Sequence, residues 1–322
     1  MHKVKILIAN SNYYNKQDLE KIKKIKHFKV TNKNFKVYKN FIKFIKQADN
    51  FDVIFTTIGF TITDTILNKY QKMCHTIITP TTGLSHIKVV NKKIEVISLN
   101  NIKKKISTVN STAELTFGLI IVLMRKIYNS INHVKKDNWN RNMFFGYDLK
   151  NKTIGIIGMG RIGKKIRKYA KSFEMKVISC DTKNVGLTLY NRKLKHLLKN
   201  SDIVTLHIPE KNNKNFFGLK KFKLMKKKSY FINTSRGEIV IERDLIYSLK
   251  KKLIAGAALD VLNGDSSFNI KKNENKLLFL SRKNSNVLIT PHIGGASNDA
   301  KKYISEILIN KTITYLKKKY VY

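Results

Sequence analysis

The sequence is poor in cysteine, proline and tryptophan. It has two cysteines, three prolines and one tryptophan in 322 residues. Cys74 and Cys180 are too few to form a disulfide framework, and unpaired thiols are typical of a reducing compartment. The composition therefore excludes the small disulfide-stapled domains and favours a cytoplasmic protein.

Long apolar runs are also absent. The apolar stretch in MHKVKILIAN at the N-terminus is too short for the core of a secretory signal followed by a cleavage site. The most apolar helix candidate, residues 115–124, covers about half of the ~20 residues that a membrane span needs. We therefore expect no insertion into a membrane.

Acidic residues are few, with 21 Asp and Glu against 64 Lys and Arg and a formal net charge of +43. The excess is spread evenly, with 18 basic against 6 acidic residues in 1–100, 22 against 5 in 101–200, and 24 against 10 in 201–322. A nucleic-acid footprint is a patch or stripe. The even spread, together with heavy use of Lys, Asn and Ile, favours the composition of an AT-rich genome over a specific nucleic-acid partner. A polyanion-binding protein is the alternative, and it would require a clustered basic face.

Short apolar runs alternate with basic amphipathic stretches, which is typical of parallel sheets covered by helices. The expected strands of the first third are 3–10, 35–39, 51–57, 75–81 and 93–99, with a helix at 18–25. A second helix is predicted from 111 to about 130, because Ser111 and Glu114 have the spacing of a capping box.

A second series of nearly continuous apolar strands follows, as expected where helices cover both faces of a sheet. These strands are 153–158, 176–181, 202–209, 229–235, 254–260 and 286–292. The residues after 297 form one helix with an apolar stripe, which can return to either domain. Two α/β domains are therefore predicted.

GMGRIG at 158–163 is a G-x-G-x-x-G motif between a predicted strand and a predicted helix, the context that dinucleotide binding requires. Gly158 permits the tight turn, Gly160 lets the backbone approach a pyrophosphate, and Gly163 lets helix and strand pack closely. Asp181 ends the next strand and suits the ribose hydroxyls, which favours NAD. Lys183 nearby leaves NADP open.

Polar side chains gather where the strands of the second series end, which is where open α/β sheets bind ligands. They are His207, Pro209, Thr234, Ser235, Arg236, Asp260, Asp265 and His292. Reduction of a 2-oxo acid needs a cation for the carboxylate, which Arg supplies, and a general acid near neutral pH, which His supplies. Arg236 can also cap a loop, His207 fits a pocket wall better than a catalyst, and Asp265 can be an ordinary turn residue.

Seven stretches together carry a resemblance to one family. They are TTGLSHI (81–87), STAELTFGLIIVLMR (111–125), KTIGIIGMGRIGKKI (152–166), SDIVTLHIP (201–209), LMKKKSYFINTSRGEIV (224–240), IAGAALDV (254–261) and ITPHIGGAS (289–297). In this order they resemble the D-isomer-specific 2-hydroxyacid dehydrogenases, the group of phosphoglycerate, D-lactate and glyoxylate/hydroxypyruvate enzymes. Residues 1–75 fit by strand pattern alone.

The resemblance implies two doubly wound parallel-sheet domains. Residues 1–100 with 297–322 would form a flavodoxin-like substrate domain, and 101–296 an inserted Rossmann domain that binds NAD. The helix from about 111 would begin the crossing between them and support a homodimer. The implied activity is that of an NAD-dependent D-2-hydroxyacid dehydrogenase.

The resemblance also implies roles for single residues, with no metal. Arg236 matches the substrate-binding arginine, and His292 matches the acid/base. The backbone near Thr82 and Gly83 matches the loop that holds the substrate carboxylate. The implied cofactor-binding positions are Gly158, Gly160, Arg161, Ile162, Gly163, Asp181, His207, Pro209, Thr234, Asp260 and Gly294.

Two places depart from the family pattern. Asp265, followed by Ser266, occupies the place of the glutamate that normally assists the histidine. Aspartate is one methylene shorter, and a weaker partner would make His292 less basic and lower its pH optimum. Ser85 and Lys88 stand where the family often has aspartate. A catalytically weak protein that senses NADH on the same fold is therefore the alternative to an enzyme.

Overall fold

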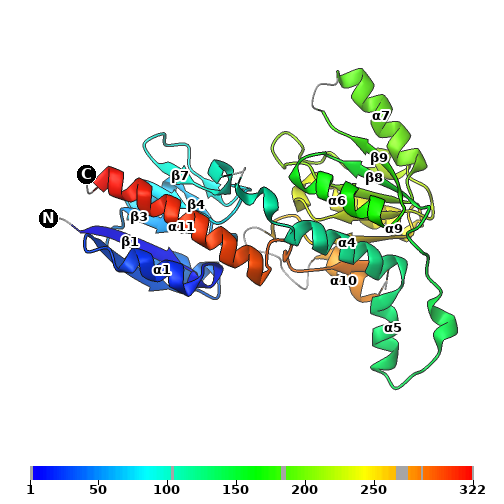
Figure 1. Cartoon of the computed structure of the whole chain (residues 1–322), viewed down its shortest axis with the longest axis horizontal. Helices are drawn as coiled ribbons and strands as arrows, with labels where there is room; N and C mark the ends of the chain where they lie inside the picture. The colour runs from blue at the N-terminus through cyan, green and yellow to red at the C-terminus, as the bar shows by residue number, and fades with distance from the viewer. Residues whose placement is uncertain (1–2, 103–104, 183–185, 266–274, 284–285, 321–322) are drawn as a thin grey trace. The chain divides into compact units, whose positions relative to one another are not determined.

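The computed structural model describes residues 3–102, 105–182, 186–265, 275–283 and 286–320. The chain divides into two compact units (Figure 1). One contains Met1–Val109 and Ala296–Tyr322, together with a short segment that begins at Asp265. The other contains Asn110–Gly264 and the segment that ends at Gly295. Lys183 and Ser266 lie outside the described residues.

The sheet of the first unit is parallel and has the order β2-β1-β3-β5-β7. Its strands are β1 (Val4–Ala9), β2 (Phe28–Lys33), β3 (Val53–Phe55), β5 (Thr76–Ile78) and β7 (Glu95–Ile97). A two-stranded ribbon joins β4 (Ile62–Thr63) to β6 (Ile87–Lys88). The strand order changes direction between β1 and β3, so the loops that follow these strands diverge at the carboxyl edge.

Helices cover both faces of this sheet because alternate residues of β1 point to opposite sides. Ile6 and Ile8 pack with α1 (Lys16–Lys23) and α11 (Asn298–Tyr320), while Leu7 packs with α2 (Tyr38–Gln47) and α3 (Asp64–Tyr70). The C-terminal helix thus belongs to the first unit, where α1 and α11 lie on the same face of the sheet (Figure 1).

One strand expected in the first unit was wrongly placed. The strand expected at 35–39 lies at Phe28–Lys33, where Val4 of β1 pairs with Phe28. Residues 35–39 instead lead into α2, because Phe41 and Ile45 bury one helical face.

The boundary after residue 100 lies after Val109 in the structure. The reason is packing: the short turns η2 (Leu99–Ile102) and η3 (Lys105–Thr108) bury Ile102 and Ile106 against Ile304 and Ile307 of α11.

The second unit has a six-stranded parallel sheet with the order β13-β12-β11-β10-β8-β9. Its strands are β8 (Thr153–Ile157), β9 (Lys176–Cys180), β10 (Ile203–Leu206), β11 (Tyr230–Asn233), β12 (Gly256–Leu259) and β13 (Val287–Ile289). The strand order changes direction between β8 and β10, which makes the carboxyl ends of these two strands the expected ligand crevice. The predicted doubly wound α/β class is confirmed in both units.

Two layers of helices enclose the second sheet. On one face, α4 (Ser111–Met124) and α6 (Arg161–Ser172) pack against Ile154, Ile156 and Ile232. The other face, which includes Val204 and Phe231, carries α7, α8, α9 and α10. These helices span Leu187–Asn200, Leu219–Phe222, Glu242–Lys250 and Lys276–Lys283.

The helix predicted from 111 to about 130 is shorter and begins differently. Asn110 is the N-cap, since its carbonyl accepts the N–H groups of Ala113 and Glu114, and no side chain caps the helix. Ser111 lies inside the first turn, where its buried hydroxyl has no hydrogen-bond partner among the described residues. The helix ends at Met124, because Lys126 adopts a left-handed conformation with φ 53°. The capping-box prediction was therefore wrong.

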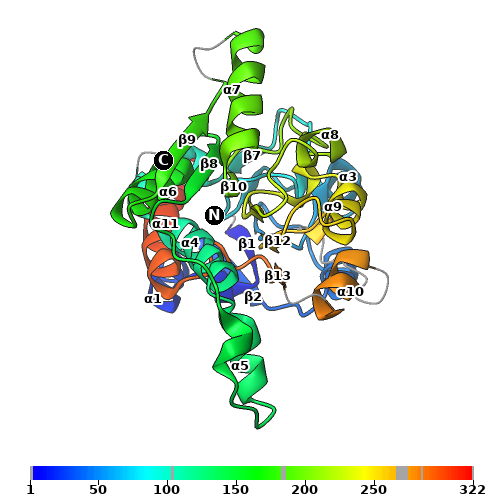
Figure 2. The same cartoon turned by 90° about the vertical axis from the view of Figure 1, so that its right-hand side faces the viewer.

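A short arm follows α4. It comprises α5 (Ile127–Val134) and residues 135–147, and it extends away from the sheet of its own unit in both views (Figures 1 and 2). Helix α5 has no buried residue, and Trp139 is 90% exposed.

By length and hydropathy alone, the stretch Lys105–Met124, which contains η3 and α4, is the one helical segment among the described residues that could cross a membrane. Residues such as Phe117 and Leu123 are buried in the core of the second unit, and a core helix passes the same test.

Candidate cofactor and substrate site

The glycine motif forms a tight turn between β8 and α6. Gly158 has φ +96°, and a Cβ there would overlap the carbonyl oxygen of His207. A Cβ on Gly163 would overlap the carbonyl oxygen of Gly158. Gly160 differs, because a Cβ there would meet no atom within 4 Å. Gly160 is the N-cap of α6 and supplies no side-chain cap, so open space adjoins a helix N-terminus that suits a phosphate.

Asp181 lies beside this turn because β9 pairs with β8. Its Oδ2 accepts the N–H of Met159 at 2.6 Å, which fixes the turn directly. Arg161 begins α6, and burial lowers the pKa of its guanidinium. Ile162 is half-buried against the sheet core. The uncapped helix end, the open space at Gly160 and the adjacent carboxylate together fit a dinucleotide.

His207 and Pro209 follow β10, which pairs with β8 on the side opposite to β9. The Nε2 atom of His207 lies 3.0 Å from Oγ1 of Thr205, and burial lowers the pKa of His207 to about 3. The ring is therefore neutral at physiological pH, as a residue of the pocket wall would be. Pro209 is exposed.

The Asp260 carboxylate holds the turn that contains His292. Its Oδ1 accepts the hydroxyl of Thr290 at 2.6 Å and the N–H of Ile293 at 2.8 Å, while Oδ2 accepts the N–H of Gly294 at 2.7 Å. Asp260 is 1% exposed, and burial raises its pKa against the opposing effect of these bonds.

These hydrogen bonds, the Asp260 clasp, also fix the backbone conformation of His292. Its N–H donates to the carbonyl of Asp260 at 2.9 Å, and its φ is 56°. This left-handed conformation costs about 1–2 kcal/mol for a residue other than glycine. The Asp260 bonds offset that cost, so the position of His292 is set by tertiary contacts rather than by local preference.

Arg236 lies in a loop that follows β11. Its Nη1 donates to the carbonyl of Ser235 at 2.6 Å, and its own carbonyl accepts from Nδ2 of Asn233 at 2.9 Å. Gly237 follows, where a Cβ would overlap the backbone of Leu262. Thr234 is buried and lies 2.7 Å from the hydroxyl of Thr116 of α4. The arginine loop is thus held between two strands and α4.

The remaining predicted residues belong to the first unit. Thr82 and Gly83 lie in the loop after β5, where the carbonyl of Thr82 accepts from Nδ2 of Asn100 at 2.7 Å. Asp265 is half-buried and directly follows Gly264, whose N–H reaches Oε1 of Glu238.

The second unit therefore brings the glycine turn, Asp181 and His207 together at the carboxyl ends of three paired strands, β8, β9 and β10. It also joins Asp260 to the His292 turn. Sequence reasoning missed Thr290, Thr116 and Asn100. Thr290 directly precedes the proline of the ITPHIGG stretch, but nothing in a single sequence indicates that its hydroxyl reaches a carboxylate thirty residues away.

Together these features define a dinucleotide-binding α/β domain that carries a histidine and an arginine at its carboxyl edge. The family model for the NAD-binding domain of D-isomer specific 2-hydroxyacid dehydrogenases matches residues 117–294. The chain belongs to this family, its second unit is the NAD-binding domain, and NAD is the cofactor.

Relatives of known name extend the comparison. The glyoxylate reductase of Thermococcus litoralis is 36% identical over 65% of this chain and 64% of its own length. The D-3-phosphoglycerate dehydrogenase of Methanocaldococcus jannaschii is 30% identical over 82% of this chain and 49% of its own length. The chain thus spans between about half and two thirds of these two relatives.

A solved structure resembles the whole chain. The D-lactate dehydrogenase of Aquifex aeolicus, complexed with NAD and lactic acid, matches with a TM-score of 0.77 and 26% identity. The match covers 97% of this chain and 96% of the other.

Proposed function

We propose that this protein is an NAD-dependent oxidoreductase that interconverts a 2-oxo acid and the corresponding D-2-hydroxy acid. The observation that carries the proposal is the Asp260 clasp, which holds His292 in a left-handed turn directly after β13. A protein that only bound NADH, without catalysis, would not need a titratable residue in this costly backbone conformation.

Bound NADH supplies the hydride in the direction of reduction. The uncapped start of α6, with Gly160 and Arg161, would hold the pyrophosphate. The Asp181 carboxylate would accept hydrogen bonds from the ribose hydroxyls. The charge of Asp181 disfavours a 2′-phosphate, which supports NAD over NADP.

The chain's own groups would do the rest of the chemistry. Arg236 would bind the substrate carboxylate and polarise the carbonyl with its permanent charge. His292 would deliver a proton to the substrate oxygen, so that proton and hydride together yield the hydroxy acid. Asp265 would assist His292 in this role.

The test is NADH oxidation with a panel of 2-oxo acids that includes glyoxylate, hydroxypyruvate, pyruvate, and branched, aromatic and phosphorylated members. We expect turnover with at least one, and a loss of about 10²–10⁴-fold in His292→Ala, the usual contribution of a general acid. The same variant should bind NADH as the wild type does. Binding of NADH without turnover on any member would favour the alternative, an NADH-sensing protein.

We also propose that the arm of residues 127–147 pairs with a second copy of the chain. Its exposed large side chains are Tyr128, Ile131, Val134, Trp139, Met143, Phe145 and Tyr147. So many apolar side chains on one short segment indicate an interface.

Light scattering should give a dimer for the wild type and a monomer for the double variant Trp139→Ser, Phe145→Ser. Leu187→Ser, at a residue that is 78% exposed outside the arm, is the control and should remain a dimer. A monomeric wild type would refute this pairing.

A further inference from the structure

The loop after β5 presents three successive backbone N–H groups for which the described residues supply no acceptor. They belong to Thr82, Gly83 and Leu84, and none of them donates a hydrogen bond within the part of the chain that the structure describes. Thr82 is exposed, and the other two residues are half-buried. Successive free amides in a turn form a concavity that binds anions.

Two side chains hold the carbonyl groups of this loop from opposite ends. Nδ2 of Asn100 donates to the carbonyl of Thr82 at 2.7 Å. Oγ1 of Thr81 donates to the carbonyl of Gly83 at 2.8 Å. In a planar trans peptide the N–H points opposite to the C=O. Fixing these two carbonyls therefore also fixes the directions of the N–H groups of Gly83 and Leu84.

A buried chain of hydrogen bonds supports Thr81. Its Oγ1 lies 3.0 Å from Oγ1 of Thr79, which lies 3.0 Å from Nε2 of His86. All three side chains are buried, with His86 1% exposed and Thr79 fully buried. Buried polar side chains are normally hydrogen-bonded in this way.

The number of protons available fixes which group donates in each of these hydrogen bonds. The single hydroxyl proton of Thr81 is given to Gly83, so Thr79 must donate to Thr81. The proton of Thr79 is then used, so Nε2 of His86 must carry the proton that Thr79 accepts. Donation therefore runs in one direction from His86 to the loop, and each bond strengthens the next.

We infer that His86, Thr79 and Thr81, together with Asn100, are positioning residues that aim the amides of Gly83 and Leu84 at the carboxylate of the substrate. This inference rests on the proposed function and names the groups that prepare the substrate loop. It extends to residues that do not themselves touch the substrate.

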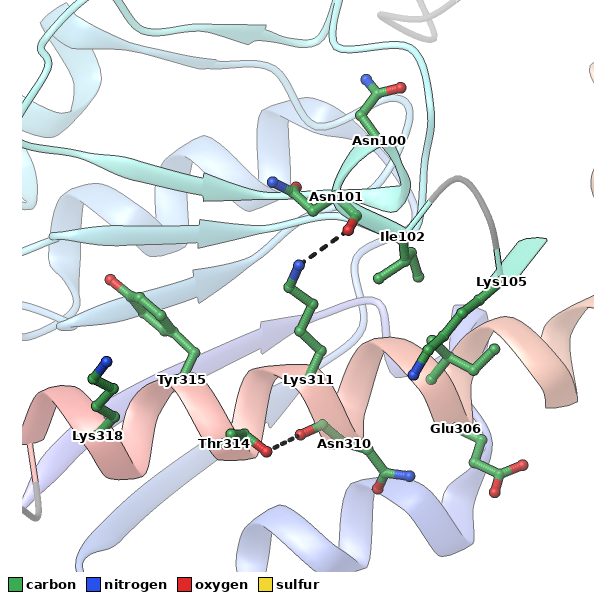
Figure 3. A pocket seen from close by; sticks show the side chains of 11 residues that line it. Asn100, Asn101, Ile102, Lys105, Glu306, Asn310, Lys311, Thr314, Tyr315 and Lys318 are labelled. Carbon is green, nitrogen blue, oxygen red and sulfur yellow. Dashed lines mark hydrogen bonds between the residues drawn. The ribbon is translucent and has the colours of Figure 1, made fainter. Parts of the chain in front are cut away.

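The turn that carries Asn100 is itself fixed. Oδ1 of Asn101 accepts the N–H of Ser98 at 2.8 Å, and Nζ of Lys311 in α11 donates to the carbonyl of Asn101 at 3.1 Å (Figure 3). Both asparagines line a groove of about 960 Å³ along α11 (Figure 3). The loop is thus held from the sheet side by Thr81 and from the α11 side by Asn100.

The test compares Thr81→Val, which keeps the shape but removes the hydroxyl, with Thr81→Ser, which keeps the hydroxyl. We expect Thr81→Val to raise KM for the 2-oxo acid about tenfold with little change in kcat, since the loop binds ground state and transition state alike. KM for NADH should stay within about twofold of the wild type, and Thr81→Ser should restore the wild-type values. Thr312→Val is the control, because Thr312 is buried in the same unit and its hydroxyl has no partner among the described residues.

Asn100→Ala provides a second variant that does not threaten folding, because Asn100 is exposed. It should also raise KM for the oxo acid several-fold. Calorimetry with oxamate, a non-reacting analogue, in the presence of NADH gives a readout that does not need turnover. Weaker oxamate binding in both variants would support the inference even if no oxo acid is reduced, an outcome that would reject only the proposed enzyme.

The inference is overturned if Thr81→Val and Asn100→Ala bind oxamate and oxo acid as the wild type does. It is also overturned if KM for NADH rises in parallel, or if the wild type binds no oxamate.

Discussion

Two neighbouring glycines of the motif at 158–163 should respond to alanine in opposite ways. At Gly160 the new methyl group meets no atom within 4 Å, and the backbone φ of −72° is normal for alanine. Folding should therefore be nearly unaffected, with a change in unfolding free energy below about 1 kcal/mol, the usual difference between Gly and Ala at a helix start. At Gly163 the methyl group would overlap the carbonyl oxygen of Gly158. Overpacking of this kind costs about 1–3 kcal/mol.

Cofactor binding should show the reverse order. The methyl group of Gly160→Ala fills the space through which the pyrophosphate approaches α6, so Kd for NADH should rise by about 10–100-fold, or about 1.4–2.7 kcal/mol. The folded fraction of Gly163→Ala should bind NADH with a Kd closer to that of the wild type. Urea unfolding followed by circular dichroism gives the stabilities, and calorimetry gives the affinities.

The reasoning would be refuted if Gly160→Ala bound NADH within twofold of the wild type, because the open space would then not be the phosphate cradle. It would equally fail if Gly160→Ala were the less stable of the two variants. Gly186, the N-cap of α7, supplies the control, because a methyl group there also meets nothing within 4 Å. Gly186→Ala should show the same small change in stability as Gly160→Ala and should leave Kd for NADH unchanged.

Two further predictions concern titratable groups, the buried Asp260 and the half-buried His207. Asp260→Asn keeps one acceptor oxygen but places an amide N–H₂ against an N–H of the His292 turn, so the free energy of unfolding in urea should fall by about 2–4 kcal/mol. The control is Asp299→Asn at an exposed residue, and equal stability of both variants would contradict the Asp260 clasp. His207 has a pKa of about 3 in the folded chain, below its ordinary 6.5. The unfolded chain therefore binds the proton first as pH falls, and His207 contributes stability above pH 6.5 that is lost between pH 6.5 and 3. The free energy of unfolding should therefore change by at most about 1.4 kcal/mol per pH unit, and by less because the ring is partly exposed. Unfolding free energies of His207→Asn, measured from pH 7 down to 4, should lack this slope, and parallel curves for both proteins would reject it.

The strands of both sheets other than β2 were predictable, because each is a short apolar run whose pattern depends only on neighbouring residues. The glycine turn was predictable for the same reason, since its spacing between strand and helix is local. The strand expected at 35–39 failed because Phe28 and Val30 alternate as well as Phe35 and Val37 do, and only pairing with β1 selects the first pair. The length of α4 failed because Lys126 turns left-handed, and local pattern does not forbid a helix through it.

By itself, the sequence determined that the chain forms two α/β domains and where the glycine turn between β8 and α6 lies, because both depend on residues close together in the chain. Only the tertiary structure decided which polar groups meet across the fold. Asp260 reaches Thr290 and Gly294, Thr116 reaches Thr234, and Asn100 reaches Thr82. Each contact joins residues on different elements, and its strength depends on burial, which removes the water that would otherwise satisfy the same groups.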